Sequence, residues 1–284
     1  MKNTRIIIAV ISPLIFLTAL IGHLSCVEES ALPQPYLVLY AFDAEGELMI
    51  DRMEIEEIDT VLGREVQRGF LAEKQVVLAE VGMGLVNASM RLQKLLDLYR
   101  PHVVIFSGIA GALDTGVSIG DIVICDKWAT HDYIYLGPDS SAVMNPVVYS
   151  PELDSMVQNR FFEVDDSLFE VTGGLDTIKL DSVGQRVPQV IIGGTGVSGN
   201  QFIDNKDKRL WLNQRFDALI VDMESSAIAQ TCYVNDVPFI IFRSASDLAG
   251  GSESETAGKQ LQKFLTVAAD NSSSVVLKYL EELE

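Results

Sequence analysis

The chain has 284 residues, 48% of them hydrophobic, and a formal net charge of −19 at pH 7. This length and composition allow one large domain with a substantial core, or two small domains. The strong acidity argues against binding to nucleic acids or anionic membranes by charge alone. The three cysteines cannot form a disulfide framework, and no Cys/His spacing indicates a zinc site.

The N-terminus, residues 1–25, has the layout of a secretory signal peptide. Lys2 and Arg5 precede an apolar run, residues 6–21, and small and polar residues follow it. The run is short for a membrane span and Pro13 interrupts it, so we expect no stable span. An uncleaved anchor is the alternative.

Cys26, the residue after the predicted signal peptide, is a candidate for lipid attachment. We therefore expect an exported protein that is periplasmic, secreted or lipid-anchored. Residues 34–284 are expected to form its single folded domain, because no long linker and no internal repeat divides them.

The first part of this domain predicts two strands and a helix. Residues 36–42 form a continuous apolar run typical of a buried strand, and an acidic turn with Glu45 follows. Residues 75–81 predict a second strand, which ends in Gly82-Met-Gly84 before an amphipathic helix over 85–99. The glycines let the backbone approach a ligand or simply make a tight turn. Glu45 is a ligand candidate or a solvated loop acid.

The middle of the chain predicts further strands that end in small or polar residues. Residues 103–106 lead into a turn in which Ala110 and Gly111 leave room for a flat ligand against the backbone. Residues 190–197 lead into a polar turn with Phe202, which either offers a stacking face or packs inward. The remaining predicted elements here are a strand over 120–126 and a helix over 153–160.

The last part of the chain places an acid beyond each of two further strands. We expect strands over 218–221 and 238–242, with Glu224 after the first and Asp247 after the second. Ligands of parallel α/β sheets bind beyond the carboxyl ends of strands, which makes both acids site candidates. Alternatively, Glu224 could be an acid in the first turn of a helix that interacts favourably with the helix dipole. Asp247 could likewise be the N-cap of the segment that follows it. The helices of this part are expected over 222–235 and 255–283, and a loop over 243–247.

Because predicted strands and helices alternate, the fold class is α/β, with one mostly parallel or mixed central sheet flanked by helices. Four stretches resemble the 5′-methylthioadenosine/S-adenosylhomocysteine nucleosidases, within the nucleoside phosphorylase superfamily. The stretches are Ala41-Phe-Asp-Ala-Glu45; Gly108-Ile-Ala-Gly111-Ala-Leu113 with Gly120-Asp121; Ser198-Gly-Asn-Gln-Phe202-Ile203; and Met223-Glu224-Ser-Ser-Ala-Ile-Ala229 with Pro238-Phe239 and Arg243-Ser-Ala-Ser246-Asp247.

The resemblance implies hydrolysis of the N-glycosidic bond of an adenine thionucleoside, by a homodimer and without a metal or other cofactor. It implies that Glu45 activates the attacking water and that Asp247 passes a proton to the adenine ring. It further implies the positions that contact the substrate or organise the site. These positions are Phe42, Ala110, Gly111, Phe202, Ile203, Met223, Glu224, Arg243 and Ser246.

The chemistry of the bond agrees with these implied roles. Two carboxyl groups that flank a glycosidic bond are the usual means of cleaving it. Asp247 must hold a proton near neutral pH, so we expect burial to raise its pKa. Glu45 must be ionised to accept a proton from water, and we expect Glu224, near a helix N-terminus, to stay ionised.

Two departures from the family pattern concern the sugar and sulfur end of the substrate. Phe42 stands where the family usually has Met, and Ile109 where it often has Ser or Thr. The preferred 5′ substituent is therefore open. A purine nucleoside phosphorylase is one alternative, although the Gly-rich turns carry no Arg or Lys to hold phosphate. A non-catalytic exported binding or storage protein is the other.

Overall fold

A central mixed sheet organises the part of the chain that the computed structural model describes, residues 34–283. Its strands are β1 (Tyr36–Tyr40), β2 (Glu54–Val61), β3 (Arg64–Leu71), β4 (Lys74–Glu80), β5 (Val103–Ala112), β6 (Ile122–Ile124), β7 (Lys127–Thr130), β12 (Phe162–Glu163), β13 (Val190–Ile192), β14 (Thr195–Ser198), β15 (Ala218–Asp222) and β16 (Phe239–Leu248). The main path runs β12-β7-β14-β15-β5-β1-β4-β3-β2, and β16 joins β5 and β6. β1 is parallel to β4 and β5, whereas β15 is antiparallel to β5.

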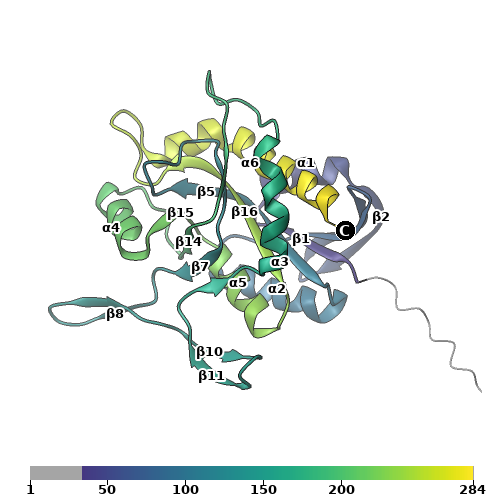
Figure 1. Ribbon diagram of the computed structural model, residues 1–284, viewed down its shortest axis with the longest axis horizontal. Coiled ribbons are helices and arrows are strands. Elements are labelled where there is room, and N and C mark those ends of the chain that lie inside the picture. The colour runs from purple at the N-terminus through teal and green to yellow at the C-terminus, as the bar shows by residue number, and fades with distance from the viewer. Residues whose placement is uncertain (1–33, 284) are drawn as a thin grey trace, which may run out of the picture. The chain divides into compact units, whose positions relative to one another are not determined.

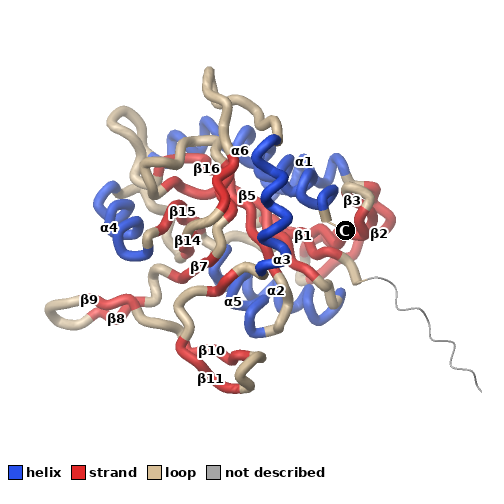
Figure 2. Tube along the Cα trace, in the orientation of Figure 1, coloured by secondary structure: helices blue, strands red, loops and turns tan. Residues whose placement is uncertain are grey.

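Helices cover both faces of this sheet (Figures 1 and 2). They are α1 (Asp43–Arg52), α2 (Leu85–Tyr99), α3 (Asp166–Glu170), α4 (Lys206–Phe216), α5 (Ser225–Val234) and α6 (Ala257–Glu282), with a 3₁₀ turn at Val171–Thr177. α6 packs on β16 and β5 and against α1, and α2 packs against α5. The predicted α/β fold with a central sheet flanked by helices is confirmed, and the sheet is mixed.

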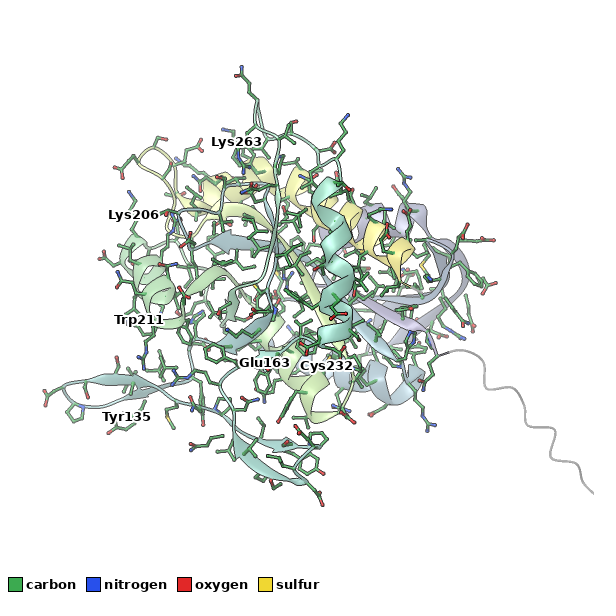
Figure 3. The ribbon with its side chains drawn as sticks, in the orientation of Figure 1. Tyr135, Glu163, Lys206, Trp211, Cys232 and Lys263 are labelled. Carbon is green, nitrogen blue, oxygen red and sulfur yellow. The ribbon has the colours of Figure 1, made fainter. Side chains whose placement is uncertain are left out.

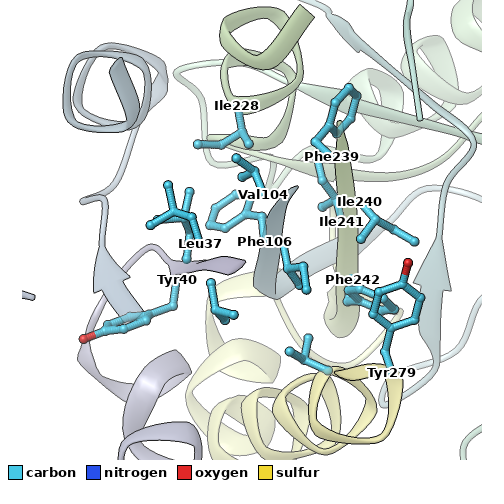
Figure 4. Close-up of a cluster of buried hydrophobic side chains, with 14 of the residues drawn as sticks. Leu37, Tyr40, Val104, Phe106, Ile228, Phe239, Ile240, Ile241, Phe242 and Tyr279 are labelled. Atoms are coloured by element: carbon cyan, nitrogen blue, oxygen red, sulfur yellow. The ribbon is translucent and has the colours of Figure 1, made fainter. Parts of the chain in front are cut away.

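The central strands β1, β5 and β16 each contain a run of consecutive apolar residues, because helices lie on both sides of the sheet. Leu37, Val38 and Leu39 are consecutive in β1, and all three side chains are fully buried. Figure 4 shows Ile228 of α5 and Tyr279 of α6 on opposite sides of the same strands. The Tyr279 ring lies 5.0 Å from that of Phe242 in β16, centroid to centroid.

Two hairpins project from the sheet beside β7 (Figure 1). They are β8 (Ile134–Leu136) with β9 (Ser141–Val143), and β10 (Val147–Ser150) with β11 (Ser155–Gln158). The helix predicted over 153–160 is therefore wrong. The backbone there is satisfied by β10 across the hairpin, and Asp154 turns the chain with a φ of +45°.

Two strands extend further than predicted, and this extension carries site residues. β5 continues to Ala112 and β16 to Leu248, because the two pair in parallel along this whole length. The small-residue turn expected after Phe106 and the loop expected over 243–247 are thus both strand. Arg243 and Asp247 consequently belong to a rigid element.

Other boundaries also differ from the sequence expectation. Glu45 lies in the first turn of α1, where an acidic loop was expected. α5 begins only at Ser225, because β15 continues to Asp222. The strand expected over 190–197 is two strands, separated at Gly193 and Gly194, whose φ angles are +99° and +88°.

No helix within residues 34–283 is both long and apolar enough to cross a membrane. The predicted signal peptide and Cys26 lie outside the described residues.

Candidate active site

A cavity of about 280 Å³ opens where β5, β15 and β16 carry their carboxyl-terminal residues. Arg243 is buried behind it, and every other predicted site residue lines it. The lining residues among those predicted are Phe42, Glu45, Ala110, Gly111, Phe202, Ile203, Met223, Glu224, Ser246 and Asp247. Segments from α1 to the loop after β16 thus meet at one place, as the strand-end argument anticipated.

Glu45 is fixed at one end of the cavity with its side chain 1% exposed. Its carboxylate accepts hydrogen bonds from the backbone N–H of Ala41, at 2.7 Å, and of Ile109, at 2.8 Å. Ser273 of α6 donates to the Glu45 carbonyl oxygen at 3.0 Å. Burial raises the pKa of Glu45, while the nearby Arg243 guanidinium and the two backbone donors oppose that shift. A held carboxyl group whose proton affinity exceeds the usual value is suited to accept a proton.

Arg243 lies between three carboxyl groups and is fully buried. Its Nε is 2.7 Å from Asp222, and its two Nη atoms are each 3.6 Å from an oxygen of Glu45 and Glu224, respectively. Phe106 covers the guanidinium, with 4.0 Å from Cζ to the ring centroid. One cation thus serves three buried acids, so the cluster binds protons more readily than three separate carboxylates would.

Glu224 is the residue directly before α5, and its side chain lines the cavity. Its Oε1 accepts a hydrogen bond from the backbone N–H of Gly84 at 2.7 Å, in the Gly82-Met-Gly84 turn before α2. Burial, followed by repulsion from Asp222, raises the pKa of Glu224 to about 8. The expectation that Glu224 stays ionised near neutral pH is therefore corrected, because its desolvation outweighs the helix terminus and the Arg243 charge.

Asp247 also lines the cavity, where the pairing of β16 with β5 shifts register between Ala245 and Asp247. Ser246 donates a hydrogen bond to its Oδ2 at 2.9 Å, and Gln260 of α6 accepts the N–H of Leu248 at 2.9 Å. Burial raises the pKa of Asp247 to about 7, the direction expected for a general acid. The alternative of a helix cap is wrong, because Asp247 is in a strand and Thr256 caps α6.

Phe202 stands at the mouth of the cavity with half of its side chain exposed. It is therefore not a core residue, whereas the neighbouring Ile203 is buried. Gly250, just after β16, donates a backbone hydrogen bond to the Ile203 carbonyl at 3.0 Å. This bond ties the loop with Phe202 to the segment that follows Asp247.

Sequence reasoning missed several residues of this site. Asp222 was not singled out, although it directly precedes the Met-Glu motif. Ser272 and Ser273 were missed too; their signal is a run of polar residues on the expected inner face of the last helix. The cavity is also lined by Met83, Gln201, Ala249, Leu261 and Leu265, whose residue types do not indicate a functional site in the sequence.

Comparison with known proteins agrees with this arrangement. A family model described as the phosphorylase superfamily matches residues 35–281. The chain belongs to this superfamily. Within it, the chain is 32% identical over 248 residues to the 5′-methylthioadenosine/S-adenosylhomocysteine nucleosidase of Staphylococcus haemolyticus, covering 87% of this chain and 99% of that protein. It is 35% identical over 217 residues to the nucleosidase of Staphylococcus epidermidis, covering 76% and 85%. The chain is thus a member of the nucleosidase family.

Solved structures of nucleosidases in the superfamily share this fold. The Neisseria meningitidis enzyme, in complex with methylthio-immucillin-A, has a TM-score of 0.73 and 27% identity, covering 88% of this chain and all of that one. The Streptococcus pneumoniae enzyme, with a transition-state inhibitor, has a TM-score of 0.71 and 25% identity, covering 88% and 99%.

The charge of the cavity bears on which superfamily reaction is feasible here. Among the described residues that line it, none is Lys or Arg, whereas Glu45, Asp222, Glu224 and Asp247 are acids. No group of His, Cys, Asp or Glu side chains in residues 34–283 has an arrangement that could hold a metal ion. The lining therefore offers a phosphate dianion no cation to pair with, whereas water needs none.

Proposed function

We propose that the protein hydrolyses the N-glycosidic bond of adenine nucleosides of the 5′-methylthioadenosine and S-adenosylhomocysteine type, releasing adenine. The observation that carries this function is one cavity that is lined by both Glu45 and Asp247, two acids held in different ways. Asp247, with its raised pKa, holds a proton for the leaving base, and the fixed Glu45 accepts one from water. The relatives and the solved neighbours are nucleosidases by name.

The reaction balances between these groups. The water oxygen forms a bond to the anomeric carbon as the bond from that carbon to the adenine nitrogen breaks. Glu45 takes the proton from water, and Asp247 gives a proton to the adenine ring, so no other reactant is needed. Glu224, with a pKa of about 8, and Met223 face the sugar, and Phe202 stacks on the base at the mouth.

The first experiment measures adenine release from 5′-methylthioadenosine by the protein from residue 26 onward, in phosphate-free buffer. We expect full turnover and free 5-methylthioribose, with no sugar 1-phosphate. A rate that rises and saturates with added phosphate would establish the phosphorylase alternative. Substrate binding without any turnover, measured by calorimetry, would establish the storage alternative.

We also propose a homodimer, supported by exposed apolar side chains on α2 and on the β8–β9 hairpin. Val86 and Met90 on α2 are 70% and 55% exposed, and Leu136 on the hairpin is 79% exposed. Figure 3 shows Tyr135 on the same hairpin, away from the sheet. Sedimentation should give twice the monomer mass for the wild type and the monomer mass for Val86→Glu; a monomeric wild type would refute the dimer.

We further propose export, supported by the charge and hydropathy of residues 1–25. The test is intact mass and N-terminal sequencing of protein made with its full N-terminus. A chain that begins at residue 26 supports cleavage, and added acyl mass on Cys26 supports a lipid anchor. A full-length chain retained in the cytoplasm would contradict export.

A further inference from the structure

Asp222 is the best-connected acid of the site, and the mechanism above gives it no task. It is 7% exposed, at the last position of β15, and residues of three elements contact its carboxylate by hydrogen bonds or an ion pair. Ser198 of β14 donates at 2.5 Å, and Arg243 of β16 approaches at 2.7 Å through Nε. From the start of α5, the hydroxyl of Ser225 donates, as does its backbone N–H, at 3.2 Å.

The orientation of the guanidinium depends on this carboxylate. Nε of Arg243 donates a hydrogen bond to Ser225 at 3.0 Å and lies 2.7 Å from Asp222 in an ion pair, while both buried Nη atoms have no hydrogen-bond partner within the described residues. Nε is the pivot of a planar fork, so a partner at Nε fixes where the two Nη atoms point. They point at Glu45 and Glu224, each 3.6 Å away.

The same carboxylate fixes the start of α5. The backbone N–H of Glu224 lies 3.3 Å from Asp222 Oδ1, and Ser198, which also binds Asp222, accepts the N–H of Ser226 at 2.8 Å. These bonds satisfy donors at the N-terminus of α5 and hold the backbone from which the Glu224 side chain reaches the cavity.

We propose that Asp222 is a positioning residue for the hydrolysis: it orients Arg243 between Glu45 and Glu224 and fixes the backbone that carries Glu224. This inference rests on the proposed nucleosidase function. Asp222 acts through its neighbours, so its loss disturbs two acids at once without removing either.

The charges around Glu224 predict a pH effect that would be absent if Asp222 only stabilised the fold. They are Asp222 on β15, Arg243 on β16 and Glu45 on α1, and the N–H of Gly84 also binds it. Neutralising Asp222 removes one repulsion and leaves Arg243 attracted only to Glu45 and Glu224. Both effects lower the pKa of Glu224, and the loss of the Asp222 charge also lowers the pKa of Glu45, the proton acceptor of the proposed mechanism, so the acid limb of kcat/KM should move to lower pH.

The test compares Asp222→Asn with the wild type, whose adenine release is established first. We expect the maximal kcat/KM to fall about 10- to 100-fold, mostly through kcat, and the acid limb to move down by about one pH unit. Asp222→Glu, which restores the charge, should return the limb to its wild-type position.

Asp121→Asn is the matched control. Asp121 is also fully buried and paired with a guanidinium, that of Arg186 at 2.5 Å, but it lies outside the cavity. It should lower the melting temperature and leave the limb in place. If Asp222→Asn does not fold, Ser225→Ala tests the proposal instead. It removes the hydroxyl group that hydrogen-bonds to both Asp222 and Arg243. We expect kcat to fall several-fold while KM stays unchanged.

Wild-type kcat and an unmoved limb in the folded variant would overturn the role of Asp222 while leaving the nucleosidase function intact. A wild type that releases no adenine would instead refute the nucleosidase function itself.

Discussion

Asp247 and Glu45 face the same cavity, but they are held in different ways. Asp247 has one neutral partner, the hydroxyl of Ser246, and burial raises its pKa to about 7. Glu45 has two backbone donors and a guanidinium nearby, which oppose the effect of its burial. This difference in partners supports the proposed roles, with Asp247 as the proton donor and Glu45 as the proton acceptor.

Asp247→Asn should lower kcat at least about 100-fold and change KM only a few-fold, because the amide keeps the shape of the side chain but has no acidic proton to give. Adenine release at substrate saturation measures this. The control is Asp217→Asn, at an exposed left-handed position that Asn also adopts. A kcat within a few-fold of the wild type would remove Asp247 from the mechanism.

Phe202→Ala should raise KM by a loss of about 1–3 kcal/mol, the usual worth of a base stacked on an aromatic ring. The ring is half exposed at the mouth, so its removal should leave the melting temperature nearly unchanged. Phe70→Ala, an exposed aromatic outside the cavity, is the matched control. A lower melting temperature with an unchanged KM would show that the ring only packs against the protein.

At the scale of elements, the parallel pairing of β5 and β16 builds the site, and Gly108 leaves room for the side chains of Arg243 and Glu45. A Cβ atom on Gly108 would lie 1.9 Å from Nη1 of Arg243 and 2.4 Å from Oε1 of Glu45. A strand residue with any side chain would therefore displace the Arg243 fork and the Glu45 carboxylate together.

Gly108→Ala should lower kcat at least about 100-fold and destabilise the fold by roughly 1–3 kcal/mol, as overpacking does in a tight core. Kinetics and thermal unfolding measure the two effects. Gly173→Ala, where a Cβ meets no atom within 4 Å, should change neither. Normal turnover in Gly108→Ala would mean that the cluster rearranges freely.

The elements also show how far a sequence can be interpreted. The helix at 85–99 was predicted with its observed bounds, because its apolar spacing is regular and a glycine precedes it. The ends of β5 and β16 were not, because small residues such as Gly108 and Ala110 resemble a turn unless the partner strand is known. The segment 153–160 was expected to be a helix, but its pairing across a hairpin with β10 makes it a turn and a strand.

The site residues likewise divide into features that the sequence could predict and features that it could not. Chemically distinctive residues in motifs, such as Glu224 and Asp247, could be proposed from the sequence, and the structure places them on one cavity. The pKa of Glu224 could not be anticipated, because it depends on burial and on Asp222, which belong to the assembled site. The roles of these residues stay predictions until variants are measured.

For the whole molecule, the buried acids make stability depend on pH. The pKa values of Asp247 and Glu224 rise from 3.8 to about 7 and from 4.5 to about 8, so the folded state binds more protons than the unfolded state in between. The contribution of these two acids to the free energy of unfolding should therefore be largest below about pH 4. It should fall by a few kcal/mol as the pH rises to about 8.

Urea unfolding at pH 5 and pH 8 checks this dependence. Asp247→Asn cannot ionise at this position, so it should lose less stability between the two values and exceed the wild type at pH 8. Asp217→Asn, which changes the net charge equally at an exposed position, should keep the wild-type slope. Equal slopes in all three proteins would show that Asp247 titrates normally.

The hydrogen bond from Ser273 to the carbonyl of Glu45 joins residues 228 positions apart. During synthesis, the ribosome therefore makes Glu45 early and the helix that hydrogen-bonds to its backbone last. Until α6 emerges, Ser272 also cannot reach the N–H of Gly108, at 3.1 Å, or the carbonyl of Phe242, at 3.1 Å. A nascent chain that stalls before α6, or a product truncated there, would thus lack a working site, and turnover would mark chains that are complete through α6.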